Sequence, residues 1–507
     1  MRNQTSQVRQ RLAAIAPRSN SAVPARRARA SRAKVVIRAL TLVLAGALCA
    51  TFSLPVAAEN AATVPESTRA QPLAVQALIV NGQATSGYPS VGALLLYADA
   101  TASSFYGACS GILIGCRTFL TAAHCVCPDN ASDAATCERE GKSDPSTLRV
   151  FLQAAGIVPV ADVAIAPNYT FAVGGDVAVI TLATPVTGVA PSALNTAHRP
   201  EIGTAATIVG YGTTATGRGS TDDSGLKRMG TVTTAACPTD IPSEAHICWE
   251  FGGSGANSCE GDSGGPLFVD FGGGMVLAGV TSGGHSFNCL APDSAFDADV
   301  FVNRAWIADT AGTDLGTESC DLPAVGTALT TTSLSDGDLS SAGSEARAQF
   351  EVPDGTAVLR IALNAQIGSG SGFASELNDF DLFARAGSAP TTQVFDCADT
   401  NPTPFGSCEI TAPRSGTWHV LIRRNLGAGA YQVAATMFAA AAALPCTGDC
   451  NGDGAVTVDE MVTGVAVVLG SADLGVCNAL DANGDGMVTV DEIVAAVTYA
   501  LNGCPRP

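Results

Sequence analysis

Charged residues are scarce in this chain of 507 residues: Asp, Glu, Lys and Arg make up 14%, whereas hydrophobic residues make up 47%. A disordered polyelectrolyte has the opposite composition, so we expect a folded protein. The length exceeds what one hydrophobic core ordinarily serves and indicates two to four domains. The 54 glycines and the many Thr, Val and Ala residues favour a mostly β structure with many turns.

Basic residues are sparse beyond the N-terminus. Ten of the 27 Lys and Arg residues lie in residues 1–58, and the first acidic residue is Glu59, which leaves 17 basic against 46 acidic residues. So acidic a chain argues against nucleic acid or an anionic membrane surface as the partner. We interpret the acidity as a contribution to solubility.

Long apolar runs are also missing, apart from one near the N-terminus. An Arg-rich stretch precedes "ALTLVLAGALCATFSLPVAA", and the small residues Val56 and Ala58 suit cleavage after Ala58. We predict a signal peptide at 1–58, a propeptide at 59–78, and secretion without a transmembrane anchor in the mature form. The alternative is a membrane anchor, although a serine and a proline interrupt the run.

Zinc-site spacing is absent from the cysteines and histidines. Sixteen of the 17 cysteines follow Cys49. An even number in an exported chain suggests disulfides rather than free thiols.

Alternating apolar segments indicate the domain organisation. "SVGALLLYA", "TLRVFLQAA", "DVAVITL" and "GMVLAGVTS" predict strands within 79–312, and "VFVNRAWIADTAG" predicts a closing helix. Residues 321–440 alternate with period two between Gly and Pro turns, which predicts a small β-sandwich. Residues 446–507 contain a repeat of period 32.

Three short segments carry groups suited to nucleophilic catalysis: "TAAHC" with His124, "GGDVAVITL" with Asp176, and "GDSGGP" with Ser263. A serine hydroxyl becomes a strong nucleophile when a base takes its proton, and the imidazole pKa near neutrality suits that base. A buried carboxylate fixes the imidazole tautomer. Glycines beside the serine let backbone N–H groups, here those of Gly261 and Ser263, reach a developing oxyanion.

These motifs, in the order His, Asp, Ser, resemble those of the chymotrypsin/trypsin (S1) family of serine proteases. The resemblance covers 79–312 and implies two β-barrels. It also implies an endopeptidase that forms an acyl-enzyme on protein or peptide substrates and needs no cofactor for catalysis. A new N-terminus at Ile79 is expected to pair with Asp262 and shape the oxyanion hole. Leu78 precedes that bond and does not suit a trypsin-like activator.

The same resemblance assigns a substrate pocket. Its floor aligns with Asn257 rather than an acid, Gly284 lines its wall, and Ser282 supports Asp176. Without a buried carboxylate we predict no strong preference for cleavage after Lys or Arg. The resemblance implies the disulfides Cys109–Cys125, Cys237–Cys248 and Cys259–Cys289. Among the other cysteines, Cys127–Cys137 would close a local loop and leave Cys116 for Cys320, but other pairings stay open.

Residues 345–437, within 321–440, resemble the bacterial pre-peptidase C-terminal domain. The matching stretches include "NDFDLFARAGSAP", "GTWHVLIR" and "GAYQVAATM". The resemblance implies a compact β-sandwich, with a hairpin closed by Cys397–Cys408. Asp379 and Asp381 have two readings, a surface metal or ligand site and solubility residues at a strand edge.

The repeat at 446–507 resembles the paired EF-hand-type loops of dockerins. "GDCNGDGAVTVDEMV" recurs as "LDANGDGMVTVDEIV", each with the oxygen ligands, turn glycine and terminal acid that a Ca²⁺ loop needs. We predict a small α-helical module that binds structural Ca²⁺ and anchors the protein to a cohesin-like or cell-surface partner. The expected ligands are Asp449, Asn451, Asp453, the Ala455 carbonyl and Glu460, then Asp481, Asn483, Asp485, the Met487 carbonyl and Glu492. Four cysteines in this region depart from the dockerin type and leave cohesin binding open.

The sequence disfavours two other functions. A non-catalytic secreted interaction protein on the same scaffold is disfavoured, because the chain keeps His124, Asp176, Gly261 and Ser263. A lipase-type hydrolase is disfavoured because its triad runs Ser, Asp, His, although "GDSGG" fits its nucleophile motif.

Overall fold

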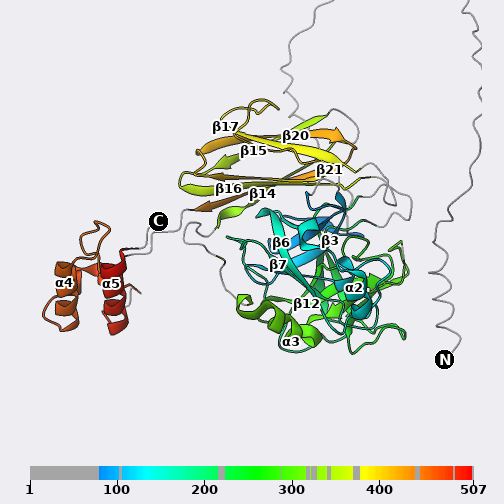
Figure 1. Cartoon of the computed structure of the whole chain (residues 1–507), viewed down its shortest axis with the longest axis horizontal. Helices are drawn as coiled ribbons and strands as arrows, with labels where there is room; N and C mark the ends of the chain where they lie inside the picture. Colours follow the sequence, from blue (N-terminus) through cyan, green and yellow to red (C-terminus); the bar gives the residue numbers. More distant parts are fainter. Residues whose placement is uncertain are drawn as a thin grey trace, which may run out of the picture. The chain divides into compact units, whose positions relative to one another are not determined.

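The computed structural model describes residues 79–101, 105–214, 223–286, 288–315, 320, 328–339, 344–368, 377–439, 446–482 and 486–504 (Figure 1). The predicted signal peptide and propeptide lie outside these residues. In the described ranges, no helix combines the length and apolar character needed to cross a bilayer.

The first barrel closes six antiparallel strands in the order β2-β3-β4-β7-β6-β5. The strands are β2 (Val91–Tyr97), β3 (Phe105–Leu113), β4 (Thr118–Thr121), β5 (Leu148–Leu152), β6 (Gly156–Ile165) and β7 (Ala178–Leu182). Three of the predicted apolar segments form β2, β5 and β7, which confirms them as strands. Leu94, Phe119 and Ile180 are fully buried in the interior.

The second barrel runs β9-β10-β13-β12-β11-β8, and pairing of β8 with β9 closes it. Its strands are β8 (Ala205–Gly210), β9 (Arg228–Ala235), β10 (His246–Phe251), β11 (Pro266–Asp270), β12 (Met275–Gly284) and β13 (Asp293–Asp299), with β1 (Gln83–Ala84) paired to β9. The fourth predicted segment forms β12. The expectation of two β-barrels is therefore confirmed.

Two α-helices accompany the barrels. Helix α3 (Val300–Ala311) confirms the predicted closing helix; Asp299 caps its first turn, and Gly312, with φ +59°, ends it. Helix α2 (Ala134–Glu140) was not predicted, because seven residues are too few to display a helical period. The Cys127–Cys137 disulfide ties α2 to the segment that follows His124.

Single-turn 3₁₀ helices connect several elements of the described chain. They are η1 (Ala123–Cys125), η2 (Pro145–Thr147), η3 (Gly312–Asp314), η4 (Leu474–Val476) and η5 (Asn478–Leu480). Of these, η1 carries His124.

Eight further strands form two four-stranded sheets, ordered β14-β21-β16-β19 and β15-β20-β17-β18. The strands are β14 (Ala328–Asp338), β15 (Glu345–Val352), β16 (Thr356–Ala365), β17 (Asp379–Ala386), β18 (Cys397–Asp399), β19 (Phe405–Thr411), β20 (Gly416–Leu426) and β21 (Ala430–Ala439). One hydrophobic cluster takes alternate residues from both sheets, among them Ile361 and Val433 from one and Leu382 and Val420 from the other. The sheets therefore pack face to face as a β-sandwich.

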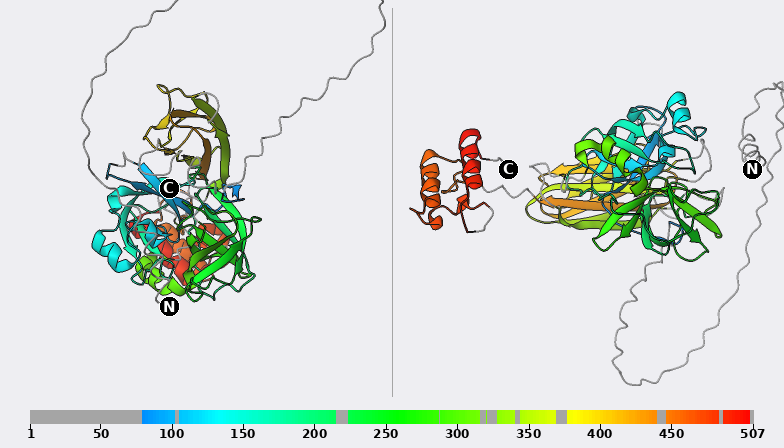
Figure 2. Two further views of the ribbon diagram at one scale, coloured as in Figure 1. Left: turned by 90° about the vertical axis from the view of Figure 1, so that its right-hand side faces the viewer. Right: turned by 90° about the horizontal axis from the view of Figure 1, so that it is seen from below.

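The C-terminal region contains helices α4 (Val458–Val468) and α5 (Val490–Asn502), which lie side by side (Figure 2). Each begins with a capping box, Thr457 with Glu460 and Thr489 with Glu492. The sequence repeat thus appears as two copies of a loop followed by a helix.

Eight disulfides join the sixteen cysteines that follow Cys49. They include the four pairs implied by family resemblance, together with Cys116–Cys320, Cys127–Cys137, Cys446–Cys504 and Cys450–Cys477. The last two link the start of the C-terminal module to its end and to its middle. These disulfides stabilise a module whose core is too small to be stable by packing alone.

Candidate active site

His124 and Asp176 lie beside the ends of neighbouring strands of the first barrel. His124 follows β4 and Asp176 precedes β7, and β4 pairs with β7. His124 Nδ1 lies 2.7 Å from Asp176 Oδ2, and the His124 backbone N–H donates to Asp176 Oδ1 at 3.0 Å. The Ser282 hydroxyl donates to Oδ2 at 2.6 Å. Asp176 is fully buried, so these donors hold its carboxylate in one orientation.

The pair is electrostatically complementary. Burial alone raises the pKa of Asp176, but the charge of His124 and the hydrogen bonds outweigh burial and hold this pKa below its usual value. Burial alone lowers the pKa of His124, but the charge of Asp176 and their hydrogen bond raise it above its usual value. His124 is therefore a stronger base than a free imidazole, with Nδ1 fixed toward Asp176.

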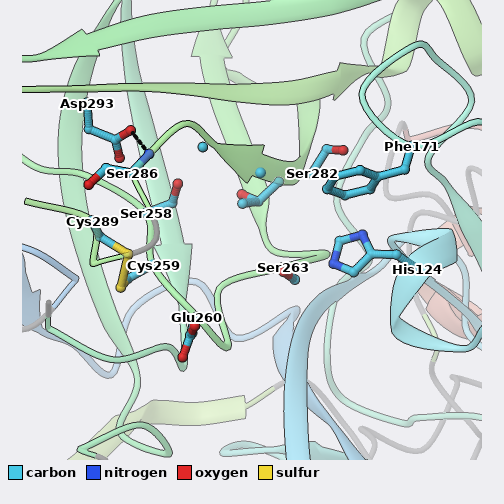
Figure 3. A pocket seen from close by; sticks show the side chains of 13 residues that line it. His124, Phe171, Ser258, Cys259, Glu260, Ser263, Ser282, Ser286, Cys289 and Asp293 are labelled. Atoms are coloured by element: carbon cyan, nitrogen blue, oxygen red, sulfur yellow. Dashed lines mark hydrogen bonds between the residues drawn. A yellow bond between two sulfur atoms is a disulfide. The ribbon is translucent and has the colours of Figure 1, made fainter. Parts of the chain in front are cut away.

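Ser263 comes from the second barrel, in the turn before β11. Its carbonyl accepts the Ser110 N–H at 2.8 Å, and the Gly264 N–H donates to the Thr281 carbonyl at 2.8 Å. A Cβ at Gly264 would clash with the Ser110 carbonyl, so only glycine fits there. The side chain of Ser263 lies beside the ring of His124 (Figure 3). The structure thus brings the three predicted catalytic residues together between the barrels.

Gly261 and Ser263, the predicted oxyanion donors, flank Asp262. Gly261 has φ +91°, a backbone conformation that glycine adopts readily, and its carbonyl accepts the Ser110 hydroxyl at 2.8 Å. Neither the Gly261 nor the Ser263 N–H donates to an acceptor in the described part of the chain. Two unpaired donors beside the predicted nucleophile suit a developing oxyanion.

Asp262, the predicted partner of the Ile79 amine, is 3% exposed. Its carboxylate accepts the N–H groups of Gly212 at 2.8 Å and of Cys259 at 2.9 Å. Burial raises the pKa of Asp262 to about 7, despite these donors and the charge of Arg228. The Ile79 side chain is buried in the second barrel, but among the described contacts no bond joins Ile79 to Asp262. While Leu78 is attached, the Ile79 nitrogen is an uncharged amide.

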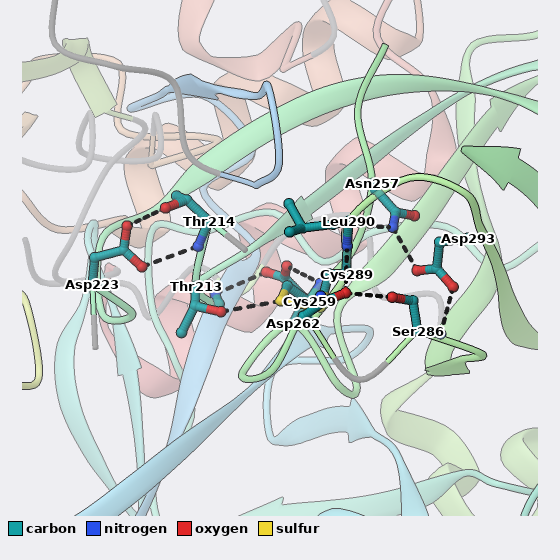
Figure 4. Close-up of a disulfide and its surroundings, with 12 residues drawn as sticks. Thr213, Thr214, Asp223, Asn257, Cys259, Asp262, Ser286, Cys289, Leu290 and Asp293 are labelled. Atoms are coloured by element: carbon teal, nitrogen blue, oxygen red, sulfur yellow. Dashed lines mark hydrogen bonds between the residues drawn. A yellow bond between two sulfur atoms is a disulfide. The ribbon is translucent and has the colours of Figure 1, made fainter. Parts of the chain in front are cut away.

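A cavity of about 230 Å³ opens beside His124 and Ser263 (Figure 3). At its end away from His124 lies Asp293, which is 5% exposed. Asp293 accepts the side-chain amide of Asn257 at 2.8 Å and the backbone N–H of Ser286 at 2.7 Å (Figure 4). The cavity therefore contains an oriented carboxylate.

This arrangement corrects the predicted pocket. Asn257 does not line the cavity: it is fully buried behind Asp293 and also accepts the indole N–H of Trp249 at 3.1 Å. The prediction of a pocket without a buried carboxylate is wrong, because the acid comes from the opposite strand, β13. Asp293 begins β13, where it pairs with Phe251 of β10, and it lies 36 residues from Asn257 in the sequence. Gly284 lines the wall, where a Cβ would lie 3.2 Å from an Asp293 oxygen.

Phe171 is a site residue that the sequence analysis missed. Its ring packs edge-on against the His124 ring, with centroids 5.6 Å apart, and it is 41% exposed. Gly283 lies next to both Phe171 and Phe296, since a Cβ there would lie 3.4 Å from the Phe171 ring and only 2.8 Å from the Phe296 ring. The signal was an aromatic residue in the loop just before Asp176, opposite a glycine.

The first predicted Ca²⁺ loop is curled around Asp449, which accepts the N–H groups of Gly452 and Gly454 at 2.8 Å each. Glu460 accepts the N–H groups of Cys450 at 2.9 Å and Thr457 at 2.7 Å. In this arrangement the acids of the loop keep their carboxylates hydrogen-bonded to the backbone. The donor set is entirely oxygen and fits Ca²⁺ in kind.

The second loop repeats this pattern where it is described. Asp481 accepts the Gly486 N–H at 2.8 Å, and Glu492 accepts the Ala482 N–H at 2.9 Å. Asn483 and Asp485 lie outside the described residues. Among described groups, Cys446, Asp449 and Cys504 also come close together, but the two cysteines form a disulfide and offer no thiolate.

The trypsin family profile matches residues 82–307, and the profile of the bacterial pre-peptidase C-terminal domain matches residues 345–424. Brachyurin from Leptuca pugilator is 32% identical over 221 residues, 41% of this chain and 88% of that protein. Trypsin eta from Drosophila erecta is 28% identical over 45% of this chain and 88% of that protein, and serine protease 1 from Rattus norvegicus is 31% identical over 41% and 82%. On its fold, its site and these relatives, the chain belongs to the trypsin family of serine endopeptidases.

Proposed function

We propose that this endopeptidase works through a triad of Ser263, His124 and Asp176. Ser263 Oγ attacks the scissile carbonyl while His124 Nε2 takes its proton and then passes it to the leaving amine. Water then attacks the acyl-enzyme, His124 takes the proton of the water, and the ester bond breaks as that proton passes to Ser263 Oγ. The carrying observation is the buried Asp176, whose bond to Nδ1 orients the imidazole beside Ser263. The unpaired N–H groups of Gly261 and Ser263 stabilise the oxyanion.

The substrate preference follows from Asp293. A carboxylate at the end of a cavity beside the nucleophile attracts a cationic side chain, so the residue before the scissile bond is Lys or Arg. The bonds from Asn257 and Ser286 keep the carboxylate aimed into the cavity rather than toward bulk water. Protein and peptide substrates with such residues are the expected class.

Cleavage after Leu78 activates the enzyme. The Ile79 side chain already lies in the second barrel, and the freed amine then turns toward Asp262 and pairs with it. Support comes from the carboxylate itself, which is buried with two backbone donors and a pKa raised to about 7. A cation beside such a buried carboxylate stabilises its ionised form.

Active-site labelling tests these steps together. Protein beginning at Ile79 is incubated with a fluorophosphonate probe beside a Ser263→Ala control and a sample that still carries residues 59–78. Labelling of the Ile79-start form alone is expected. Equal labelling with residues 59–78 attached would retain the nucleophile and reject the activation step, and no labelling of a folded sample would reject the catalytic role of Ser263.

Secretion is part of the same proposal. The predicted signal peptide agrees with eight disulfides in the described chain, which form and persist in oxidising compartments. Detection of the protein outside intact cells, starting beyond Ala58, checks it; a product retained with residues 1–58 would favour the membrane-anchor alternative.

A second function, anchoring, is favoured by the surface of the C-terminal helices. Apolar residues are exposed at equivalent positions of both helices, 32 residues apart: Val458, Val462, Val465 and Leu469 on or after α4, and Val490, Val494, Val497 and Leu501 on α5, at 39–79% exposure. Exposed apolar residues in such a repeated stripe indicate a protein-binding surface. We assign this module to a cohesin-like or cell-surface protein, with Ca²⁺ holding the loops that orient the helices.

Titration of the full chain with Ca²⁺ tests the metal, and Glu460→Gln with Glu492→Gln is the matched control. Two binding events are expected in the wild type and loss of both in the double variant. Binding to an immobilised cohesin-type domain tests the partner, with Val462→Asp and Val494→Asp on the two stripes. Calcium binding without any cohesin binding would leave a metal-stabilised module with another partner.

A further inference from the structure

The β-sandwich shares a hydrophobic core with the first catalytic barrel. Phe405 at the start of β19 is 1% exposed, and its ring centroid lies 5.1 Å from that of Phe151 in β5 and 6.0 Å from that of Phe105 in β3. Ala362 and Ile367 belong to the same cluster. Separation of the sandwich would expose these aromatic side chains to water, which disfavours a loosely tethered appendage.

Two buried amides of the sandwich bind one segment of the second barrel, residues 224–227. Asn364 and Gln432 face each other on β16 and β21 and are 0% and 1% exposed. The Gln432 side-chain oxygen accepts the Lys227 N–H at 2.9 Å, and the Asn364 amide donates to the Gly225 carbonyl at 2.9 Å. The Ile367 N–H donates to the Ser224 carbonyl at 2.8 Å. The sandwich therefore binds three of the four residues in this segment.

The same segment is bonded to the strand end that orients Asp262. The Gly225 N–H donates to the Tyr211 carbonyl at 2.7 Å, and the next residue, Gly212, donates its N–H to the Asp262 carboxylate at 2.8 Å. The Tyr211 N–H donates to the Ser110 hydroxyl at 2.8 Å, and that hydroxyl donates to the Gly261 carbonyl at 2.8 Å. Two short chains of hydrogen bonds thus connect the sandwich to the Asp262 carboxylate and to the Gly261 carbonyl, next to the predicted oxyanion hole.

We propose that Asn364 and Gln432 are positioning residues for the active site. They hold residues 224–227, and through Tyr211 and Gly212 they keep Asp262 and the oxyanion donors in place. The β-sandwich is then a required part of the mature enzyme, docked on the barrel that carries Ser263. The effect of these two residues on kcat rests on the proposed catalytic function, whereas their effect on the position of residues 224–227 does not.

Chains that start at Ile79 and keep all residues through Pro507 test the effect on rate. Gln432→Met keeps the size of the side chain and removes its bonds to Lys227, together with those that it accepts from Asn364 and Gln153. Arg360→Met is the control, because Arg360 bonds to Thr187 at 2.6 and 2.8 Å, in the same interface but away from 224–227. We expect Gln432→Met to lower kcat about tenfold with KM within about twofold, and Arg360→Met to change kcat less than about twofold. Gln432→Glu, which keeps the acceptor for the Lys227 N–H, should recover part of the loss.

Hydrogen exchange gives a readout that needs no activity. In the Ser263→Ala background, Gln432→Met should speed amide exchange at Gly212, Gly225 and Lys227 about tenfold, and Arg360→Met should not. Equal exchange at these amides in both variants would overturn the proposal. So would kcat values that fall in proportion to Tm in both variants, because the loss would then reflect stability alone. If fluorophosphonate fails to label the wild type while the exchange difference holds, the catalytic assignment falls and the positioning of 224–227 stands.

Discussion

The two barrels each contribute a buried carboxylate to the site, and the two are in opposite states. Asp176 in the first barrel is 0% exposed, pairs with His124 and has a lowered pKa. Asp262 in the second is 3% exposed, accepts two backbone N–H groups and has a pKa raised to about 7. Similar burial gives opposite shifts, so the partner rather than the depth decides the state of each acid.

Three other buried ionisable groups in or beside the second barrel have pKa values shifted by burial, as Asp262 does. Burial lowers the pKa of Lys227 to about 7 and that of Arg228 to about 9, and it raises the pKa of Asp297 well above its usual value. The half of the site on the first barrel is thus complete once the chain folds. The half on the second barrel is completed by a new charge, which the cleavage at Ile79 supplies in the proposed mechanism.

The largest effect is expected from breaking the His124–Asp176 pair on the first barrel. Asp176→Asn keeps the shape but no longer fixes the imidazole as a base, so kcat should fall about 10⁴-fold. Because Asp176 raises the pKa of His124, the wild-type acid limb of kcat/KM should lie above the usual imidazole value, and the variant limb should move to lower pH. Hydrolysis of a peptide ester between pH 5 and 9 measures both; a loss below tenfold would mean that Asp176 does not serve His124.

The next largest effect concerns Asp262 on the second barrel, the proposed partner of the Ile79 amine. In chains starting at Ile79, Asp262→Asn removes the carboxylate that the amine is to meet, and kcat/KM should fall on the order of 10²-fold through loss of the oxyanion hole. The same substitution in chains that carry residues 59–78 should change little. An equal loss in both forms would show that Asp262 acts without the Ile79 amine.

The sequence was most informative where a motif and a strand pattern coincide. His124, Asp176 and Ser263 stand in short motifs, and β2, β5, β7 and β12 alternate clearly enough to be read as strands. Asp293 was missed because it approaches Asn257 from 36 residues away, at the start of β13, and no local spacing reveals that contact.

The contacts of the sandwich were not predictable either. Asn364 and Gln432 interrupt apolar strands, which marks each as a buried polar group in need of a partner. The partners, Gly225 and Lys227, lie more than a hundred residues away in another domain. A sequence pattern indicates that such a partner is required, but only the packing of the domains identifies it.

Substrate selectivity gives an effect of similar size that is confined to cationic substrates. Asp293→Ser removes the charge at the end of the cavity, so kcat/KM for Arg reporters should fall about 10²-fold while Leu reporters change little. Asn257→Ser is the matched control, since it leaves the carboxylate but removes one of its donors. Reporters that differ only at the residue before the scissile bond measure the ratio. If Arg and Leu reporters lose equally, Asp293 supports the fold of the pocket rather than its selectivity.

The smallest effect is a pH dependence of stability in the chain that still carries residues 59–78. Unfolded Asp has a pKa near 4, and folded Asp262 one of about 7. Between these values the folded state binds a proton that the unfolded state does not, so the free energy of unfolding falls as pH rises from about 4 to 7. In a Ser263→Ala background, Tm should drop by roughly 5 °C more between pH 5 and 7.5 with Asp262 than with Asp262→Asn. Cleavage after Leu78 should abolish that difference, because the amine then pairs with the carboxylate; a difference that survives cleavage would mean that the second barrel stays incomplete in the mature enzyme.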